Sequence, residues 1–187
     1  QLSLGNIKTD TIRVSNFNNK IILNATIAIN QDQTNSYSSR IMGRIEKLYY
    51  KNLGDFVRKG VPIYDLYSEE LNNAKQEYLL VLEKKNTFKN ESIIDIDKII
   101  QSAKNKLLLW GLTENQIDGM TKSDKTTTHT TFYSNSEGYI TSLDVLEGDY
   151  VMEGERVVKL ADLSTLWIEA QVYTSQYTDI ENKALVK

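Results

Sequence analysis

Apolar and polar residues alternate near both ends of the chain, a pattern typical of β-strands. Residues 11–14 (TIRV) and 20–30 (KIILNATIAIN) predict two strands, and residues 166–173 (LWIEAQVY) predict another. The polar segment 31–39 between the N-terminal strands and the centre of the chain is expected to be a connection. We expect the strands from the two ends to pair as part of one β-domain.

An internal repeat is the most informative pattern in the centre of the chain. Residues 43–66 are GRIEKLYYKNLGDFVRKGVPIYDL, and residues 138–160 are GYITSLDVLEGDYVMEGERVVKL. Both copies contain Gly-x-Ile-x-x-Leu, then Gly-Asp-aromatic-Val-x-x-Gly, and both end in an apolar strand. Each copy alone predicts only a few short strands, which are barely stable in isolation. The repeat therefore predicts a pseudo-symmetric sandwich in which two halves bury a shared apolar face.

Four glycines are expected to form the structural turns of this repeat. Gly54 and Gly60 belong to the first copy, and Gly148 and Gly154 occupy the same places in the second. Glycine has no Cβ, so it adopts a positive φ angle at little steric cost. We therefore expect these positions to turn the chain between strands.

Between the two copies the apolar residues recur at helical spacing. Ser68 followed by Glu69 and Glu70 predicts a helix start, because a serine side chain caps the first turn and acidic residues favour its positive end. The helix carries the stripe Leu71, Ala74, Tyr78, Val81, Leu82 and Lys85.

Two further helices are predicted after the first. Ser92 is expected to cap the second, and Gly111 to end it. Thr113 is expected to begin a short third helix that reaches about Gly119, and residues 121–131 are expected to form a loop. The stripe of the second helix is Ile96, Ile99, Ile100, Ala103, Leu107 and Trp110.

Composition narrows the class of protein. The chain has 187 residues, 40% of them hydrophobic and 25% charged, which is typical of a globular protein. The net charge is −3 and no cluster of Lys or Arg occurs, so nucleic acid is not expected as a partner. The absence of cysteine excludes disulfides and thiolate metal sites. No apolar run approaches the ~18 residues of a membrane span, and we expect any signal peptide or lipid anchor to lie outside these residues.

Catalytic and metal-binding patterns are absent from the sequence. No Gly-x-Ser-x-Gly turn and no phosphate-binding glycine loop occurs. His129 is the single histidine and is expected to lie in the 121–131 loop. Met42, Met120 and Met152 are scattered, whereas capture of Cu(I) or Ag(I) requires clustered thioethers. We therefore predict no catalytic residues, no cofactor and no metal ligands.

A lysine-modified carrier domain is one alternative that the repeat leaves open, because the repeat is typical of lipoyl-like domains in general. Biotinyl and lipoyl domains present the modified lysine on a tight turn between the two halves. Here residues 67–131 occupy that place, and Lys75, Lys84 and Lys85 lie on the predicted helices. A Cu(I)/Ag(I) chaperone is the other alternative.

The order of these segments resembles the periplasmic adaptor (membrane-fusion) proteins of tripartite efflux pumps, and within them the heavy-metal, CusB-like branch. The Tyr-Ser-x-Glu-Leu segment and the Leu-Leu-x-x-Gly-x-x-x-x-Gln-Ile segment, in this order between the repeats, make the resemblance specific. The residues that carry it are Gly43–Tyr49, Gly54–Ile63, Tyr67–Leu71, Gln76–Tyr78, Leu107–Leu112, Gln116–Ile117 and Leu163–Trp167.

The resemblance implies an α+β, multi-domain fold. It comprises a split lipoyl-like (barrel-sandwich hybrid) β-domain with a short α-helical bundle inserted, and a partial β-barrel from the two chain ends. On this division residues 1–37 and 163–187 belong to the barrel, residues 38–66 and 132–162 to the hybrid domain, and residues 67–131 to the helical insertion.

The resemblance also implies a function that composition cannot show. Such adaptors are not enzymes; they act in the periplasm, associated with the inner membrane. They link an inner-membrane RND transporter to an outer-membrane channel, and they self-associate into a multimer. Heavy-metal ions are the cargo that this branch implies. The sequence departs from metal-binding adaptors in one respect, since residues 1–41 contain no Met, His or Cys. No partner-docking residues are assigned.

Overall fold

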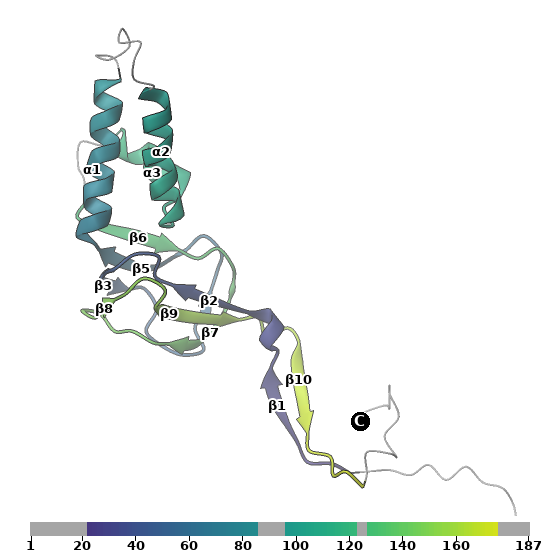
Figure 1. Cartoon of the computed structure of the whole chain (residues 1–187). Helices are drawn as coiled ribbons and strands as arrows, with labels where there is room; N and C mark the ends of the chain where they lie inside the picture. The colour runs from purple at the N-terminus through teal and green to yellow at the C-terminus, as the bar shows by residue number, and fades with distance from the viewer. Residues whose placement is uncertain (1–21, 86–95, 123–126, 176–187) are drawn as a thin grey trace, which may run out of the picture. The chain divides into compact units, whose positions relative to one another are not determined.

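The computed structural model describes residues 22–85, 96–122 and 127–175 (Figure 1). Two four-stranded antiparallel sheets and three α-helices lie within a compact unit of residues 28–167. The described elements in chain order are β1 Ala25–Ile29, a 3-10 turn Gln31–Gln33, β2 Thr34–Ser38, β3 Gly43–Leu48, β4 Phe56–Val57, β5 Pro62–Tyr67, α1 Glu69–Lys84, α2 Ile96–Leu109, α3 Glu114–Met120, β6 His129–Tyr133, β7 Gly138–Leu143, β8 Tyr150–Val151, β9 Arg156–Ala161 and β10 Leu166–Ala170.

Each sheet is built from strands of both repeat copies. One sheet has the order β2-β9-β7-β4 and the other the order β6-β5-β3-β8. The short strand of each copy pairs with the first repeat strand of the other copy, so that β4 lies against β7 and β8 lies against β3. The predicted pseudo-symmetric sandwich is therefore confirmed, with the two halves interleaved rather than simply facing each other.

The same backbone hydrogen bonds recur in the two halves. The Gly54 amide donates to the Ile140 carbonyl at 2.8 Å, and the Gly148 amide donates to the Ile45 carbonyl at 2.8 Å. Each bond runs from the turn of one copy to the first strand of the other. These bonds join residues of different repeat copies that lie far apart in the sequence, so neither half completes its own hydrogen bonding.

The repeat extends further upstream than the sequence indicates. β2 pairs with β9, and β6 occupies the equivalent place beside β5. The prediction that residues 31–39 are a connection is therefore wrong, and so is the loop predicted for the last residues of 121–131. Both strands lie at sheet edges and are rich in Ser, Thr and Asn, with few inward side chains, so the hydrophobic alternation that identifies a strand is weak.

Two buried serines show how closely the upstream strands correspond. Ser39 follows β2 and Ser134 follows β6, and each precedes the first glycine of its repeat copy by the same number of residues. The Gly154 amide donates to the Ser39 carbonyl at 2.8 Å, and the Gly60 amide donates to the Ser134 carbonyl at 2.7 Å. The repeating unit therefore contains four strands.

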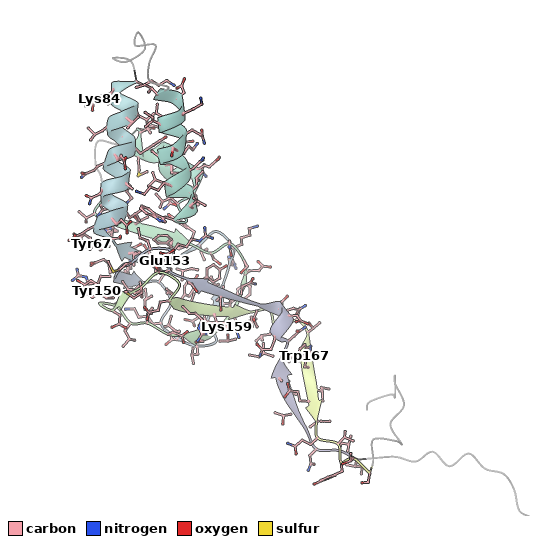
Figure 2. All side chains as sticks on the ribbon, viewed as in Figure 1. Tyr67, Lys84, Tyr150, Glu153, Lys159 and Trp167 are labelled. Carbon is pink, nitrogen blue, oxygen red and sulfur yellow. The ribbon has the colours of Figure 1, made fainter. Side chains whose placement is uncertain are left out.

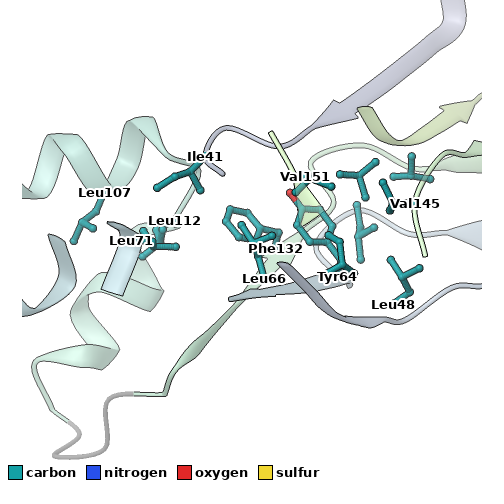
Figure 3. Close-up of a cluster of buried hydrophobic side chains, with 14 of the residues drawn as sticks. Ile41, Leu48, Tyr64, Leu66, Leu71, Leu107, Leu112, Phe132, Val145 and Val151 are labelled. Carbon is teal, nitrogen blue, oxygen red and sulfur yellow. The ribbon is translucent and has the colours of Figure 1, made fainter. Parts of the chain in front are cut away.

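Apolar side chains from both sheets and from the helices form one continuous core (Figure 3). Its helical part includes Leu71, Leu107 and Ile117, all fully buried, so the insertion packs against the β-domain instead of standing free. The largest fully buried side chains of the sheets are Ile45, Leu66, Ile140, Leu160, Val57, Val151, Val157 and Val158.

The helix ends that the structure describes follow the sequence signals. The Ser68 hydroxyl accepts a hydrogen bond from the Leu71 amide, and Thr113 forms a reciprocal capping box with Gln116. Gly111 has φ +97° and ends α2, as predicted. The predicted Ser92 cap lies outside the described residues.

Strands β1 and β10, near the two ends of the described chain, form a two-stranded sheet. This pairing of the ends was predicted, and every residue of β10 is exposed. The predicted strand at 11–14 lies outside the described residues, and the larger partial barrel stays a prediction.

Candidate interaction sites

The four turn glycines lie at exposed bends of the sandwich. Their φ angles are +86° at Gly54, +83° at Gly60, +97° at Gly148 and +85° at Gly154. No atom lies within 4 Å of a Cβ built on any of them, so backbone conformation rather than crowding favours glycine at these positions.

An apolar groove runs along the helical insertion between α1 and α2. Its cavity has a volume of about 470 Å³, and Leu80 and Ile99 remain 54% and 43% exposed within it. Val81 and Ile96 complete its apolar lining. The exposed Lys84, labelled near the upper end of α1 in Figure 2, is one of its polar lining residues. An apolar floor with a polar rim is the surface that an amphipathic helix recognises.

The groove exists because the two stripes are too wide for a single helix–helix contact. A helix that faces a core carries an apolar band of about 100°, whereas two helices alone cover only the seam between them. The structure buries the stripe ends nearest the β-domain, at Leu71 and Leu107. It leaves exposed Ile99 of the second stripe and Leu80, which lies beside the first stripe.

Lys75 is buried where α1 meets the second sheet, a feature that sequence reasoning missed. Its side chain is only 3% exposed, and its ammonium group donates to the Thr130 hydroxyl of β6. Burial lowers the pKa of Lys75 to about 8. The available signal was its position one helical turn after Leu71, on the apolar stripe. Lys75 is thus buried within the fold. The exposed Lys84 and the partly exposed Lys85 lie at the end of α1, so none of the three lysines occupies a turn between strands as a carrier lysine does.

The other candidate residues are dispersed. His129 begins β6 and is exposed, so its predicted loop position is wrong, although its solvent exposure is as expected. Met42 and Met152 are exposed, while Met120 packs against the core. Among the described residues no three His, Cys, Asp or Glu side chains gather as metal ligands, and no described helix is both long and apolar enough to span a membrane.

Comparison with known proteins assigns this architecture to a family. Residues 35–161, which include both four-strand units and the helical insertion, match the sequence model described as "CusB, barrel-sandwich hybrid domain". The chain belongs to the CusB barrel-sandwich hybrid family. The resemblance to CusB-like adaptors and the presence of a barrel-sandwich hybrid domain are thereby confirmed, while the predicted domain boundaries stay a prediction.

Relatives in the family are named for efflux and membrane fusion. The chain is 28% identical over 149 residues to the cation efflux system protein CusB of Escherichia coli K12, a match that covers 79% of this chain and 34% of that protein. It is 25% identical over 166 residues to the putative membrane fusion protein SilB of Salmonella typhimurium, covering 89% of this chain and 36% of that protein. The chain thus spans about a third of the length of these relatives.

A solved structure shares the fold. The crystal structure of ZneB from Cupriavidus metallidurans superimposes with a TM-score of 0.57 at 17% sequence identity, covering 85% of this chain and 73% of that one. At this identity the similarity concerns the fold alone.

Proposed function

We propose that this chain is the central part of a periplasmic adaptor subunit that links an inner-membrane RND transporter to an outer-membrane channel. The observation that carries the proposal is the family match over residues 35–161, because it includes the helical insertion as well as the β-domain. The relatives' names, a cation efflux system protein and a membrane fusion protein, agree with this role.

Each part of the molecule has a place in this proposal. The hybrid domain acts as a rigid body, since its two halves are interleaved and share one core. The α1–α2 groove is the docking surface for helices of the outer-membrane channel, because its exposed leucine and isoleucine side chains offer apolar surface to an incoming helix. We propose that β1 and β10 belong to the second β-domain that the resemblance implies, and that the subunit works as a multimer.

The adaptor has no catalytic role in this proposal. Carrier domains present their modified lysine on a tight turn between the two halves. In this chain the helices that begin at the Ser68 cap take the place of that turn. Intact-mass measurement of the protein from its own host separates the two readings. The unmodified mass is expected, and a biotinyl or lipoyl adduct would instead establish a carrier domain.

Heavy-metal ions are the proposed cargo of the pump, in line with the cation efflux relative. Deletion of the gene is expected to raise the sensitivity of its host to silver, copper or zinc salts, and the wild-type gene to restore resistance. If the deletion strain keeps its resistance to every metal and becomes more sensitive to organic drugs, the cargo is an organic compound and not a metal ion. Calorimetric titration of the 187-residue chain with Ag(I) is expected to show no tight site. Micromolar or tighter binding would support the chaperone instead.

The docking surface is tested in the same host. Leu80→Glu and Ile99→Glu place a charge in the groove, and we expect each to abolish complementation and to reduce cross-linking to the channel while the protein level stays unchanged. Leu109→Glu is the matched control, since Leu109 is 73% exposed on α2 but does not line the groove. Full complementation by both groove variants would exclude this surface.

A further inference from the structure

A second cavity lies at the elbow between the helical insertion and the β-domain, away from the α1–α2 groove. Its volume is about 810 Å³, within the ~300–1,000 Å³ range of pockets for small organic molecules. It is lined by the link from α2 to α3, by the ends of β2 and β6, and by the start of β5. Pockets of this kind occur preferentially where two structural units meet.

One wall of the cavity is aromatic. Tyr64 and Phe132 stack with ring centroids 5.0 Å apart and an interplanar angle of 15°, and both are more than nine-tenths buried. Figure 3 shows the two rings side by side in the core. Burial raises the pKa of Tyr64 to about 12, which agrees with its enclosed position. Because Tyr64 and Phe132 are only 4% and 8% exposed, they offer a ligand a small apolar contact.

The charge of the lining has a single sign. Arg40 is the one charged residue that lines the cavity. Glu153 lines a neighbouring cavity together with Arg40, but it does not line this one. Its Nη1 donates to the Leu109 carbonyl at 3.3 Å, and Arg40 forms no ion pair with any carboxylate among the described residues. A guanidinium has five N–H donors, so most of its capacity for a carboxylate is unused.

The remaining polar groups divide into those already engaged and those available. Tyr37, Ser134 and Gln116 are occupied by hydrogen bonds within the protein. The Asn115 side chain lines the cavity, is exposed, and makes no hydrogen bond to another described residue. Its amide is therefore available to a ligand next to the Arg40 charge.

We propose that the elbow cavity binds a small organic anion, with its carboxylate on Arg40 and its flat apolar body against Tyr64 and Phe132. The inference concerns a site separate from the helix groove and holds whether or not the chain serves in an efflux pump. The donors, the aromatic wall and the absence of lining carboxylates select for both the charge and the ring of the ligand.

The test uses the 187-residue chain and 2-naphthoate as the probe, followed by amide chemical-shift changes in NMR. A ligand of this size is expected to bind with a Kd on the order of 1 mM, from about 0.3 kcal/mol per non-hydrogen atom. The expected shifts lie at Gly111–Gln116 and Phe132–Asn135. Arg40→Gln is expected to weaken binding about tenfold, the loss of one charge-assisted contact, and Arg40→Lys to weaken it less.

Two controls keep the proposal falsifiable. Arg58→Gln removes an exposed arginine that does not line the cavity and is expected to leave the Kd unchanged. Asn115→Trp fills the rim and is expected to abolish binding, with circular dichroism to verify folding. Equal affinity for the neutral 2-naphthylmethanol, equal affinity for inorganic phosphate, shifts confined to the α1–α2 groove, or no binding at all would each overturn the proposal.

Discussion

The two four-strand units of this protein have nearly the same backbone but different surroundings. The first unit, β2 to β5, leads directly into α1, whereas the second, β6 to β9, leads into β10. At equivalent edge positions Thr130 of β6 is 5% exposed beneath the helices, while Asn35 of β2 is exposed. The inserted helices thus cover one edge of the sandwich and leave the other open, so two copies of one motif acquire different roles.

A second difference lies in one atom. Tyr37 and Phe132 precede the first glycine of their copies by the same number of residues, yet only Tyr37 carries a hydroxyl. That hydroxyl accepts the Asn135 and Ser136 amides at 3.1 and 2.9 Å and contacts the Ser134 hydroxyl at 3.0 Å. The first unit therefore anchors the loop of the second, and no equivalent bond is possible in return. Substitutions at matched positions test which features belong to the repeat and which to one unit.

The largest effect is expected from Gly43→Ala at the start of the first repeat copy. A Cβ there would lie 2.4 Å from the Tyr67 carbonyl oxygen and 2.9 Å from Leu66 Cγ, and a backbone atom cannot move aside easily. We expect a loss of about 3 kcal/mol in unfolding free energy, measured by urea denaturation.

Gly138→Ala is the matched change in the second copy, where the nearest atom, the Ala161 carbonyl oxygen, is 2.8 Å away. The approach is less close than at Gly43, but Gly138 also has φ +158°, which adds backbone strain, so a loss of similar size is expected. An unchanged urea midpoint for Gly43→Ala would contradict the close approach of Gly43 to the Tyr67 carbonyl of β5.

Removal of the Tyr37 hydroxyl is expected to have the next largest effect. Tyr37→Phe leaves two loop amides without their acceptor, at a cost of about 1–3 kcal/mol. Tyr139→Phe is the control, since Tyr139 is 39% exposed and its hydroxyl bonds to no other described residue. Equal midpoints for the two variants would contradict the anchoring role.

The turn glycines should respond alike in the two halves. Gly54→Val and Gly148→Val force a β-branched residue to positive φ, and each is expected to destabilise by roughly 1–2 kcal/mol. Gly119→Ala in α3 serves as the control, because φ is not positive there and alanine favours the helix. A difference of more than about 1 kcal/mol between Gly54→Val and Gly148→Val would break the equivalence of the halves.

The smallest change in unfolding free energy is expected at Lys75, beneath the helices, and there the substitution should stabilise the protein. Lys75→Met replaces a buried amine and should stabilise by about 1 kcal/mol, the order of the cost of a poorly compensated polar group. Lys84→Met at an exposed site should change stability little.

The pH dependence of stability gives an independent measurement of the same lysine. The folded pKa, about 8, lies below the ordinary lysine value of 10.5, so above pH 8 the unfolded chain retains a proton that the folded chain has lost. Wild-type stability should therefore gain a contribution as pH rises from about 8 towards 10.5. Lys75→Met should lack that contribution, and identical pH profiles for the two proteins would exclude a shifted Lys75.

The features that the sequence predicts correctly depend on local signals. The turn at Gly111 and the caps at Ser68 and Thr113 are encoded within a few residues, and the repeat is visible because its glycines and apolar strands recur in order. The sequence does not predict the edge strands β2 and β6, because their residues are mostly polar. It does not predict the burial of Lys75 either, because lysine side chains are seldom buried. The position of Lys75 next to the apolar stripe is the one signal that indicates this burial.

The candidate sites depend on packing that a single sequence does not encode. Whether Leu80 and Ile99 cover each other depends on how the two helices pack against the β-domain. The elbow cavity brings Arg40 near Asn115 and Phe132, three residues from separate segments. Family resemblance supplies the fold and the proposed role, but not these juxtapositions.

The pairing of β2 with β9 also has a consequence for how the chain is made. Thr34 lies opposite Ala161, so the first sheet cannot close until residue 161 has left the ribosome. Pairings at such long sequence separation raise the contact order and slow folding. The helices, which rely on local contacts, are expected to form first. Until the last strand is synthesised, the apolar faces of the early strands stay uncovered and open to association with other chains.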